Sequence, residues 1–304
     1  MKIIALLPFK NEEWILPTYL SNILQVVDEI IALDDGSTDG SVAILKNAGA
    51  KVVSFDGSMQ TKEWGASKTH REHLLKLGRD SGGTHFVLLD ADETFTSNFV
   101  CVARDVFEEL KPGQKLSMQW LALWKSHTHY RHDNTVWSNN FKDFVVRDDD
   151  GLSYSWDGCS THSVGRTPGS NSGTWLTLDT NVGAVLHYQF SAWNSFQLKQ
   201  CWYRCLELCN KGKEAAQSIN QNYSITMMDN NVEMMEMPTS WTDGIVTPKV
   251  GIFDPSWKRE SYITSCLYML EDIYRMFDKY GVEYFEYLDI WHIPQLKKKK
   301  DKNE

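Results

Sequence analysis

Short apolar runs alternate with amphipathic segments over the first part of the chain. The run at residues 2–8 is almost wholly apolar and ends at a proline, a pattern typical of a strand buried on both faces. Pro17 suits the first turn of a helix. Apolar residues then recur at helical spacing, at Leu20, Ile23, Leu24 and Val27. The pattern therefore predicts a strand followed by a helix over residues 17–27.

The same alternation continues as far as residue 93. Further strands are predicted at residues 29–33, 51–55 and 85–89. Helices are predicted to begin at Val42 and Ala66. Strands that alternate with helices in this way predict right-handed crossovers and a mostly parallel sheet covered by helices on both faces. Ligands bind such sheets outside the carboxyl ends of the strands. In this chain those ends carry polar and acidic residues at 8–12, 34–39 and 90–93.

Beyond residue 95 the alternation weakens. Strands are expected at residues 116–123, 141–147 and 184–190. A helix is expected over residues 194–210, and another after the Asp254-Pro255 pair that ends at Gly281. Cysteines recur every four residues on the first of these helices, at 201, 205 and 209. Cys is among the most buried residue types and no Cys-x-x-Cys pair accompanies these, so we expect a core stripe rather than a metal site.

The charge balance excludes one class of partner. The 304 residues include 31 Lys and Arg against 40 Asp and Glu, a net charge of −9. Such a surface repels nucleic-acid phosphates, so no nucleic-acid partner is expected. No apolar stretch approaches the about 20 residues that cross a bilayer, and no signal-peptide pattern is present, which favours a cytoplasmic location. The Lys-rich run at residues 297–300 allows at most a peripheral membrane contact.

Several nucleotide- and metal-binding motifs are excluded by inspection. The loop at residues 35–40 matches the start of a calcium loop, but Lys46 stands where a bidentate glutamate belongs. The sequence also lacks the Gly-x-Gly-x-x-Gly dinucleotide loop and the Gly-x-x-x-x-Gly-Lys phosphate loop. EF-hand, NAD-type and P-loop chemistry therefore have no support.

Two carboxylates at the end of the fourth predicted strand suit a divalent cation. Asp90 and Asp92 are two residues apart, so in extended chain both project to the same side. Mg²⁺ and Mn²⁺ are usually held by one or two carboxylates and completed by substrate phosphates. A turn or helix cap at the strand end is the structural alternative.

Three motifs, in this order, resemble family 2 glycosyltransferases of the GT-A fold. They are Pro8-Phe9-Lys10-Asn11-Glu12, the Asp-Asp-Gly-Ser-Thr-Asp-Gly run at residues 34–40, and Leu88-Leu89-Asp90-Ala91-Asp92-Glu93. The resemblance implies an α/β fold with a mostly parallel, Rossmann-like sheet flanked by helices, and a helical C-terminal extension. It implies a nucleotide-sugar-binding half at residues 1–93, an acceptor-binding half at 94–212 and an extension with a basic tail at 213–304. Viral and bacterial glycan synthesis is the setting it suggests.

The resemblance also assigns roles around the donor. Pro8 would line the nucleotide pocket, and Asp35 would accept a hydrogen bond from the base. Lys10 and Glu12 would contact the sugar nucleotide. Arg71, in the helix before the fourth predicted strand, would meet a phosphate or the base.

Metal ligands are implied in the same way. Asp92 would ligate Mn²⁺ or Mg²⁺ directly, whereas Asp90 would face the ribose or the water shell of the metal. His187 would be a third ligand, although a lone histidine beside apolar residues is also typical of a core position. A bound cation would stabilise the departing diphosphate as a Lewis acid.

The catalytic base is the least defined part of the site. Many relatives carry a His-Glu pair where this chain has His162-Ser163. Asp157 is the candidate base or acceptor-orienting acid, because an inverting enzyme needs a carboxylate to deprotonate the acceptor hydroxyl. Asp157-Gly158 is also a frequent turn pair. Inversion and retention both remain open.

The sequence thus predicts a metal-dependent hexosyl- or pentosyltransferase. It would move a sugar from a UDP- or GDP-sugar to a carbohydrate or glycoconjugate acceptor. One alternative is a non-catalytic carbohydrate-binding protein on the same fold. The other is a sugar nucleotidyltransferase, against which the absence of a Gly-rich, Arg-containing loop after the first strand counts.

Overall fold

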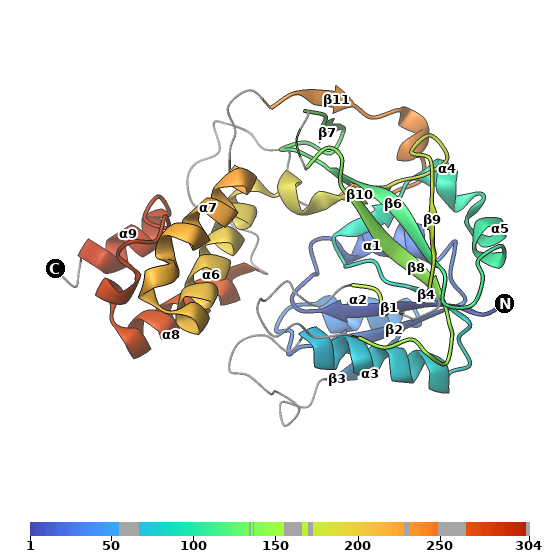
Figure 1. The fold of residues 1–304 in the computed structure, drawn as a ribbon, viewed down its shortest axis with the longest axis horizontal. Helices are drawn as coiled ribbons and strands as arrows, with labels where there is room; N and C mark the ends of the chain where they lie inside the picture. The colour runs from blue at the N-terminus through green and yellow to red at the C-terminus, as the bar shows by residue number, and fades with distance from the viewer. Residues whose placement is uncertain are drawn as a thin grey trace. The chain divides into compact units, whose positions relative to one another are not determined.

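The chain divides into two units, which are considered separately. The computed structural model describes residues 1–54, 67–133, 135, 137–154, 166–169, 173–227, 232–248 and 266–301. Met1–Ser191 and Glu233–Ile252 form the first unit, and Ala192–Val232 and Phe253–Glu304 form the second. The first unit is an α/β layer structure and the second is helical (Figure 1). The predicted functional halves are defined by ligand rather than by contacts, and they stay a prediction.

The first unit begins with parallel strands, as the apolar runs predict. They are β1 (Ile3–Phe9), β2 (Glu29–Asp34), β3 (Lys51–Ser54) and β4 (His85–Val87). They lie in the order β3-β2-β1-β4, and the crossovers are α1 (Leu16–Ile23), α2 (Ser41–Asn47) and α3 (Ser67–Asp80). Strand β1 pairs in parallel with both β2 and β4, so its carboxyl end lies beside theirs.

The sheet continues with strands of mixed direction. They are β5 (Glu93–Phe95), β6 (Lys115–Ala122), β8 (Phe141–Arg147), β9 (Trp175–Thr177) and β10 (Val185–His187). Strand β8 is antiparallel to β4 and β6, β10 is parallel to β6, and β5 is antiparallel to β10. The order over the described residues is β3-β2-β1-β4-β8-β6-β10-β5, with β9 beside β6. The predicted α/β fold with a mostly parallel sheet is confirmed.

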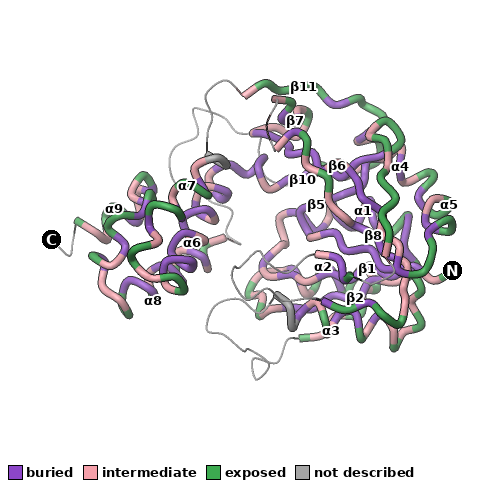
Figure 2. Tube along the Cα trace, viewed as in Figure 1, coloured by how far each residue is buried: buried purple, intermediate pink, exposed green. Residues whose placement is uncertain are grey.

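Alternating residues of β1 bury into two cores, one on each face of the sheet. Ile3, Ala5 and Leu7 join one apolar cluster with α1 residues such as Leu16 and Tyr19. The short helices α4 (Ser97–Val100) and α5 (Ala103–Glu108) add Phe99 and Phe107 to the same cluster. Ile4 and Leu6 pack on the opposite face with Leu74 and Leu75 of α3. Both faces are therefore covered, and the buried strands run through the centre of this unit (Figure 2).

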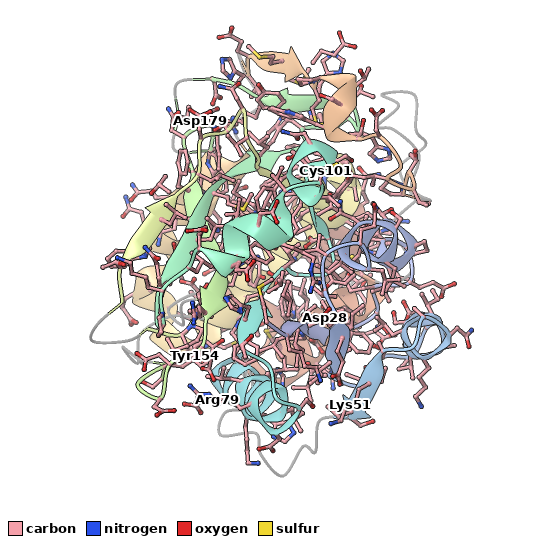
Figure 3. The ribbon with its side chains drawn as sticks, turned by 90° about the vertical axis from the view of Figure 1, so that its right-hand side faces the viewer. Asp28, Lys51, Arg79, Cys101, Tyr154 and Asp179 are labelled. Atoms are coloured by element: carbon pink, nitrogen blue, oxygen red, sulfur yellow. The ribbon has the colours of Figure 1, made fainter. Side chains whose placement is uncertain are left out.

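Polar contacts fasten α3 to the sheet. Arg79, labelled in Figure 3, binds Asp148 through Nε and Nη2 at 2.8 to 3.1 Å, just after β8 ends.

A smaller sheet pairs β7 (His129–Arg131) with β11 (Met234–Glu236). Two turns of 3₁₀ helix, at Tyr188–Ser191 and Thr239–Trp241, complete the described elements of this unit.

The second unit packs helices around an apolar seam. Its helices are α6 (Trp193–Lys211), α7 (Ala216–Met227), α8 (Leu267–Tyr280) and α9 (Pro294–Asp301). Short 3₁₀ helices cover Lys213–Ala215 and Val282–Phe285. Cys201 and Cys205 of α6 are buried as expected, and burial raises the pKa of the Cys201 thiol to about 12, whereas Cys209 is half-buried. Gly281, with φ of 82°, ends α8 as predicted.

Among the helices that the structure describes, none combines the length and apolar character needed to cross a bilayer.

Candidate functional site

The loops after β1 and β2 are bound to each other at the carboxyl edge of the sheet. The Asp35 N–H donates to the carbonyl of Phe9 at 3.0 Å. Asn11 adopts a left-handed conformation with φ of 56°, which Asn tolerates better than most residues. Its N–H donates to Ser37 Oγ at 2.9 Å, and its Oδ1 accepts the N–H of Thr38 at 2.7 Å. The two loops therefore form one rigid rim.

Most acidic groups of this rim hold the backbone. Asp34 Oδ1 accepts the N–H of Ser37 at 2.8 Å, and Asp39 Oδ1 accepts that of Ser41 at 3.0 Å. The Glu12 carboxylate accepts the indole N–H of Trp14 at 2.9 Å. These groups are thus engaged in shaping the loops.

Asp35 has a different environment, since the basic side chains of Lys10 and His70 lie beside its carboxylate. Lys10 Nζ lies 3.8 Å from Asp35 Oδ2, and His70 Nε2 lies 3.7 Å from Oδ1. Burial lowers the pKa of His70, against the attraction of Asp35. Pro8, at the end of β1, pairs with Leu33 of β2 and is half-buried beside this group. Pro8, Lys10 and Asp35 are thus brought together as the sequence predicts.

Asp90 lies between two arginines. Arg71 Nη2, from α3, donates to Asp90 Oδ1 at 3.2 Å. Arg166 Nη2 donates to the other oxygen, Oδ2, at 3.1 Å. The second guanidinium nitrogen of Arg166 binds Glu93 and the carbonyl of Leu88. Two residues that were predicted separately, Arg71 and Asp90, are therefore in contact with each other, whereas Arg166 was not expected.

Local contacts hold Arg166 in place. Its carbonyl accepts the hydroxyl of Tyr154 at 3.2 Å, and the Thr167 hydroxyl donates to the Asp143 carbonyl of β8 at 2.7 Å. Burial opposes the charge of the guanidinium, but the carboxylates of Asp90 and Glu93 raise the pKa of Arg166 above its ordinary value. Arg166 is therefore a fixed positive charge.

Asp92 and His187 face each other across the strand ends. His187 Nε2 lies 3.4 Å from Asp92 Oδ2. The backbone explains the approach, because β10 pairs with β5 and the Tyr188 N–H donates to the Asp92 carbonyl at 2.8 Å. Both side chains are buried, with exposed fractions of 9% for Asp92 and 4% for His187.

This pair fits a cation that takes further ligands from a substrate. Within the described part of the chain, no group of three His, Cys, Asp or Glu side chains is arranged to hold a metal ion. His187 Nδ1 is buried and has no hydrogen-bond partner. A neutral imidazole with its proton on Nδ1 leaves Nε2, which faces Asp92, free to donate its lone pair. One carboxylate and one imidazole match an open Mn²⁺ or Mg²⁺ site that phosphate oxygens complete.

Glu93 and Trp120 lie beneath these ligands. Glu93 is fully buried and accepts the Asp90 N–H and the Trp120 indole N–H, both at 2.8 Å. Lys142 Nζ lies 3.5 Å from the centroid of the Trp120 ring. Burial, with the charge of Arg166, lowers the pKa of Lys142 to about 8.

The predicted base Asp157 and the His162-Ser163 pair lie outside the described residues.

Two joined loops, a pair of arginines and the Asp92–His187 pair thus converge at one edge of an open α/β sheet. The sequence profile of Glycosyl transferase family 2 matches residues 5–160. The chain belongs to this glycosyltransferase family.

Solved structures of one bacterial enzyme are similar to parts of the chain. Glucosyl-3-phosphoglycerate synthase from Mycobacterium tuberculosis in complex with uridine diphosphate is 31% identical over 30% of this chain and 34% of that chain, with a TM-score of 0.24. The same synthase with Mn²⁺, UDP-glucose and phosphoglyceric acid is 26% identical over 40% of this chain and 44% of that one, with a TM-score of 0.29. The chain thus matches less than half the length of these structures. No curated protein sequence matches it.

Proposed function

We propose that this chain is a metal-dependent glycosyltransferase that moves a hexose or pentose from a UDP- or GDP-sugar to a carbohydrate or glycoconjugate acceptor. The observation that carries the proposal is the Asp92–His187 pair, whose facing oxygen and nitrogen are 3.4 Å apart at the carboxyl edge of the sheet. Family membership supplies the reaction class.

The proposed metal site consists of Asp92 and His187. Bound Mn²⁺ or Mg²⁺ would stabilise the negative charge that develops on the departing diphosphate. Asp90 is proposed to face the ribose or the water shell of the metal. Its carboxylate is kept in one orientation by Arg71 and Arg166, which bind its two oxygens separately. Arg71 is also close enough to this edge to take a role in phosphate or base recognition.

Nucleotide recognition is assigned to the rim. Asp35 is proposed to accept a hydrogen bond from the base, with Lys10 and His70 lying beside its two carboxylate oxygens. Pro8 would line the pocket, and Lys10 and Glu12 would contact the sugar nucleotide. On the acceptor side, Asp157 is proposed as the base or acceptor-orienting acid.

Thermal unfolding with nucleotides tests the donor and metal assignments together. A ligand that binds only the folded chain raises its stability. We expect UDP or GDP to raise the melting temperature with Mn²⁺ and to lose this effect in EDTA. Asp92→Asn should abolish the metal-dependent rise and sugar transfer while leaving the ligand-free melting temperature near that of the wild type.

A matched control separates this effect from a general loss of charge. Asp179→Asn removes a carboxylate that accepts only a loop N–H in the described contacts, that of Asn181, and should respond to nucleotide and Mn²⁺ like the wild type. Full transfer activity in Asp92→Asn would refute the metal assignment. Glycan binding that EDTA does not alter, without nucleotide binding, would favour the carbohydrate-binding alternative. Pyrophosphate release from a nucleoside triphosphate and a sugar phosphate would favour the nucleotidyltransferase.

A further inference from the structure

Four side chains form a row across one face of the sheet. Lys142 of β8 pairs with Met118 of β6, so both project to one face, as does Trp120 two residues further on. Ala122, two residues after Trp120, pairs with His187 of β10. His187 in turn pairs with Glu93 of β5. Side chains from β8, β6, β10 and β5 therefore lie side by side on the face that carries the proposed metal site.

Trp120 stands at the centre of this row and contacts all the others. Its ring stacks on the His187 imidazole, with centroids 4.1 Å apart and planes inclined by 20°. Lys142 Nζ lies 3.5 Å from the same ring. An imidazole and an ammonium group at these distances cannot share one face of the ring, so they occupy opposite faces. The indole is therefore clamped between β8 and β10 and has little freedom to turn.

The orientation of His187 lacks the usual support. A histidine that ligates a metal almost always donates its other ring N–H to a carboxylate, carbonyl or water, and this bond fixes the ring plane. His187 Nδ1 is buried and has no hydrogen-bond partner. Ring contacts take its place: Trp120 covers the imidazole face, and Phe190 meets it edge-on at 5.1 Å. Of these two, the stack with Trp120 is the contact that sets the plane of the imidazole.

The same indole is connected to the carboxylate motif. Trp120 Nε1 donates to Glu93 Oε1, and Glu93 Oε2 accepts the N–H of Asp90, both at 2.8 Å. Asp92 lies in the turn between Asp90 and Glu93. Trp120 therefore contacts His187 directly and reaches the turn that carries Asp92 through one carboxylate.

We propose that Trp120 is a positioning residue for the metal site: its ring face orients His187, and its indole N–H holds the Asp90–Glu93 turn through Glu93. The inference rests on the proposed function, because it takes Asp92 and His187 as the metal ligands. Trp120 itself binds neither metal nor substrate. It replaces the missing hydrogen bond at Nδ1 with a stacked ring and links both ligand-bearing segments through one side chain.

Mn²⁺ affinity measures this role without relying on turnover. Free Mn²⁺ is followed by its electron paramagnetic resonance signal during titration of the full chain, with UDP and in parallel with GDP. Loss of a residue that orients a metal ligand costs about 10- to 100-fold in metal affinity. Trp120→Leu should weaken binding by this factor. Trp120→Phe keeps an aromatic face but loses the bond to Glu93, so a smaller loss is expected.

A double-mutant cycle separates positioning from general stability. In His187→Ala, which removes the ligand, Trp120→Leu should cause a smaller loss than in the wild type, because the part of its effect that acts through His187 is already gone and only the part that acts through Glu93 is left. Trp241→Leu is the control: Trp241 is as buried as Trp120, with exposed fractions of 7% and 8%, and its ring lies 5.9 Å from that of Tyr130, inclined by 37°. This variant should lower the melting temperature without changing Mn²⁺ affinity.

Each result has one meaning. Wild-type affinity in Trp120→Leu, together with loss of binding in His187→Ala, would overturn the role of Trp120 and leave the proposed function intact. An equal loss from Trp120→Leu in the wild-type and His187→Ala backgrounds would overturn the part of the role that consists of orienting His187. If the wild-type chain binds no Mn²⁺ with either nucleotide, the proposed function fails, and this inference fails with it.

Discussion

Removing Arg166 tests whether the charges beneath the sheet edge act as one buried network. The Arg166 side chain is 13% exposed and binds Asp90, Glu93 and the Leu88 carbonyl. Glu93 is fully buried. Arg166→Met would leave the Glu93 carboxylate without its cation, while the N–H donors of Asp90 and Trp120 remain.

The expected cost follows from this burial. Breaking a buried ion pair by removing one partner costs about 3–5 kcal/mol. For a unit of this size, each 1 kcal/mol lowers the melting temperature by about 2–4 °C, so a fall of roughly 6–20 °C is expected. Arg166→Lys keeps the charge but loses the forked geometry, and should fall between the wild type and Arg166→Met.

Urea unfolding followed by tryptophan fluorescence measures the cost, and a second arginine provides the control. Arg79 makes comparable bonds to Asp148, but its side chain is 33% exposed. A pair of that exposure contributes about 0–1 kcal/mol, so Arg79→Met should change the free energy of unfolding little. If Arg166→Met costs no more than Arg79→Met, the argument that Glu93 depends on Arg166 is wrong.

Two further predictions concern the same unit. Burial, with the charge of Arg147, lowers the pKa of His85 from 6.5 to about 4. Between these two pH values the unfolded chain therefore binds a proton that the folded chain does not. The free energy of unfolding should fall as the pH decreases from about 6.5 to about 4. His85→Gln should flatten this fall in urea midpoints measured across that range, and an unchanged slope would contradict the assignment. Gly78→Ala should destabilise the chain by about 1–3 kcal/mol in the same assay, because the new Cβ would lie 2.7 Å from the Phe86 ring and 3.1 Å from Leu6. A more stable variant would mean that Phe86 moves aside at little cost and that the helix preference for Ala prevails.

The fold of residues 1–93 could be predicted because its signals are local. Apolar runs of strand length and helical periodicity alternate as far as residue 93, and the loops between them carry the polar residues. The ends differ in detail. The helix predicted over residues 17–27 ends at Ile23. Beyond it, the N–H groups of Gln25 and Val26 donate hydrogen bonds to carbonyls three residues earlier, which form turns rather than α-helix. Asp35, Asp90 and Asp92 could be proposed as site residues because each lies just beyond the end of a recognisable strand.

Arg166 could not be predicted in this way. It is 73 residues from Glu93 and 76 from Asp90, and no periodic pattern surrounds it. Its position depends on the packing of Thr167 against β8. Trp120 was placed on a strand correctly, but its neighbours depend on β8 running antiparallel between β4 and β6, which no local pattern encodes. The short strand β5, which brings Glu93 beside His187, was missed for the same reason.

The charges at this edge explain why metal and nucleotide should bind together. Three carboxylates, Asp90, Asp92 and Glu93, lie among three cations, Arg71, Arg166 and Lys142, whose charges act on one another. A divalent cation alone would add positive charge to a balanced group, and a diphosphate alone would add negative charge beside Asp92. Together they largely compensate each other in a partly buried site, where unbalanced charge is costly. Each should therefore raise the affinity for the other by the same factor, as linkage requires. A fixed, nearly neutral arrangement of opposed charges thus favours binding of both ligands together over binding of either one alone.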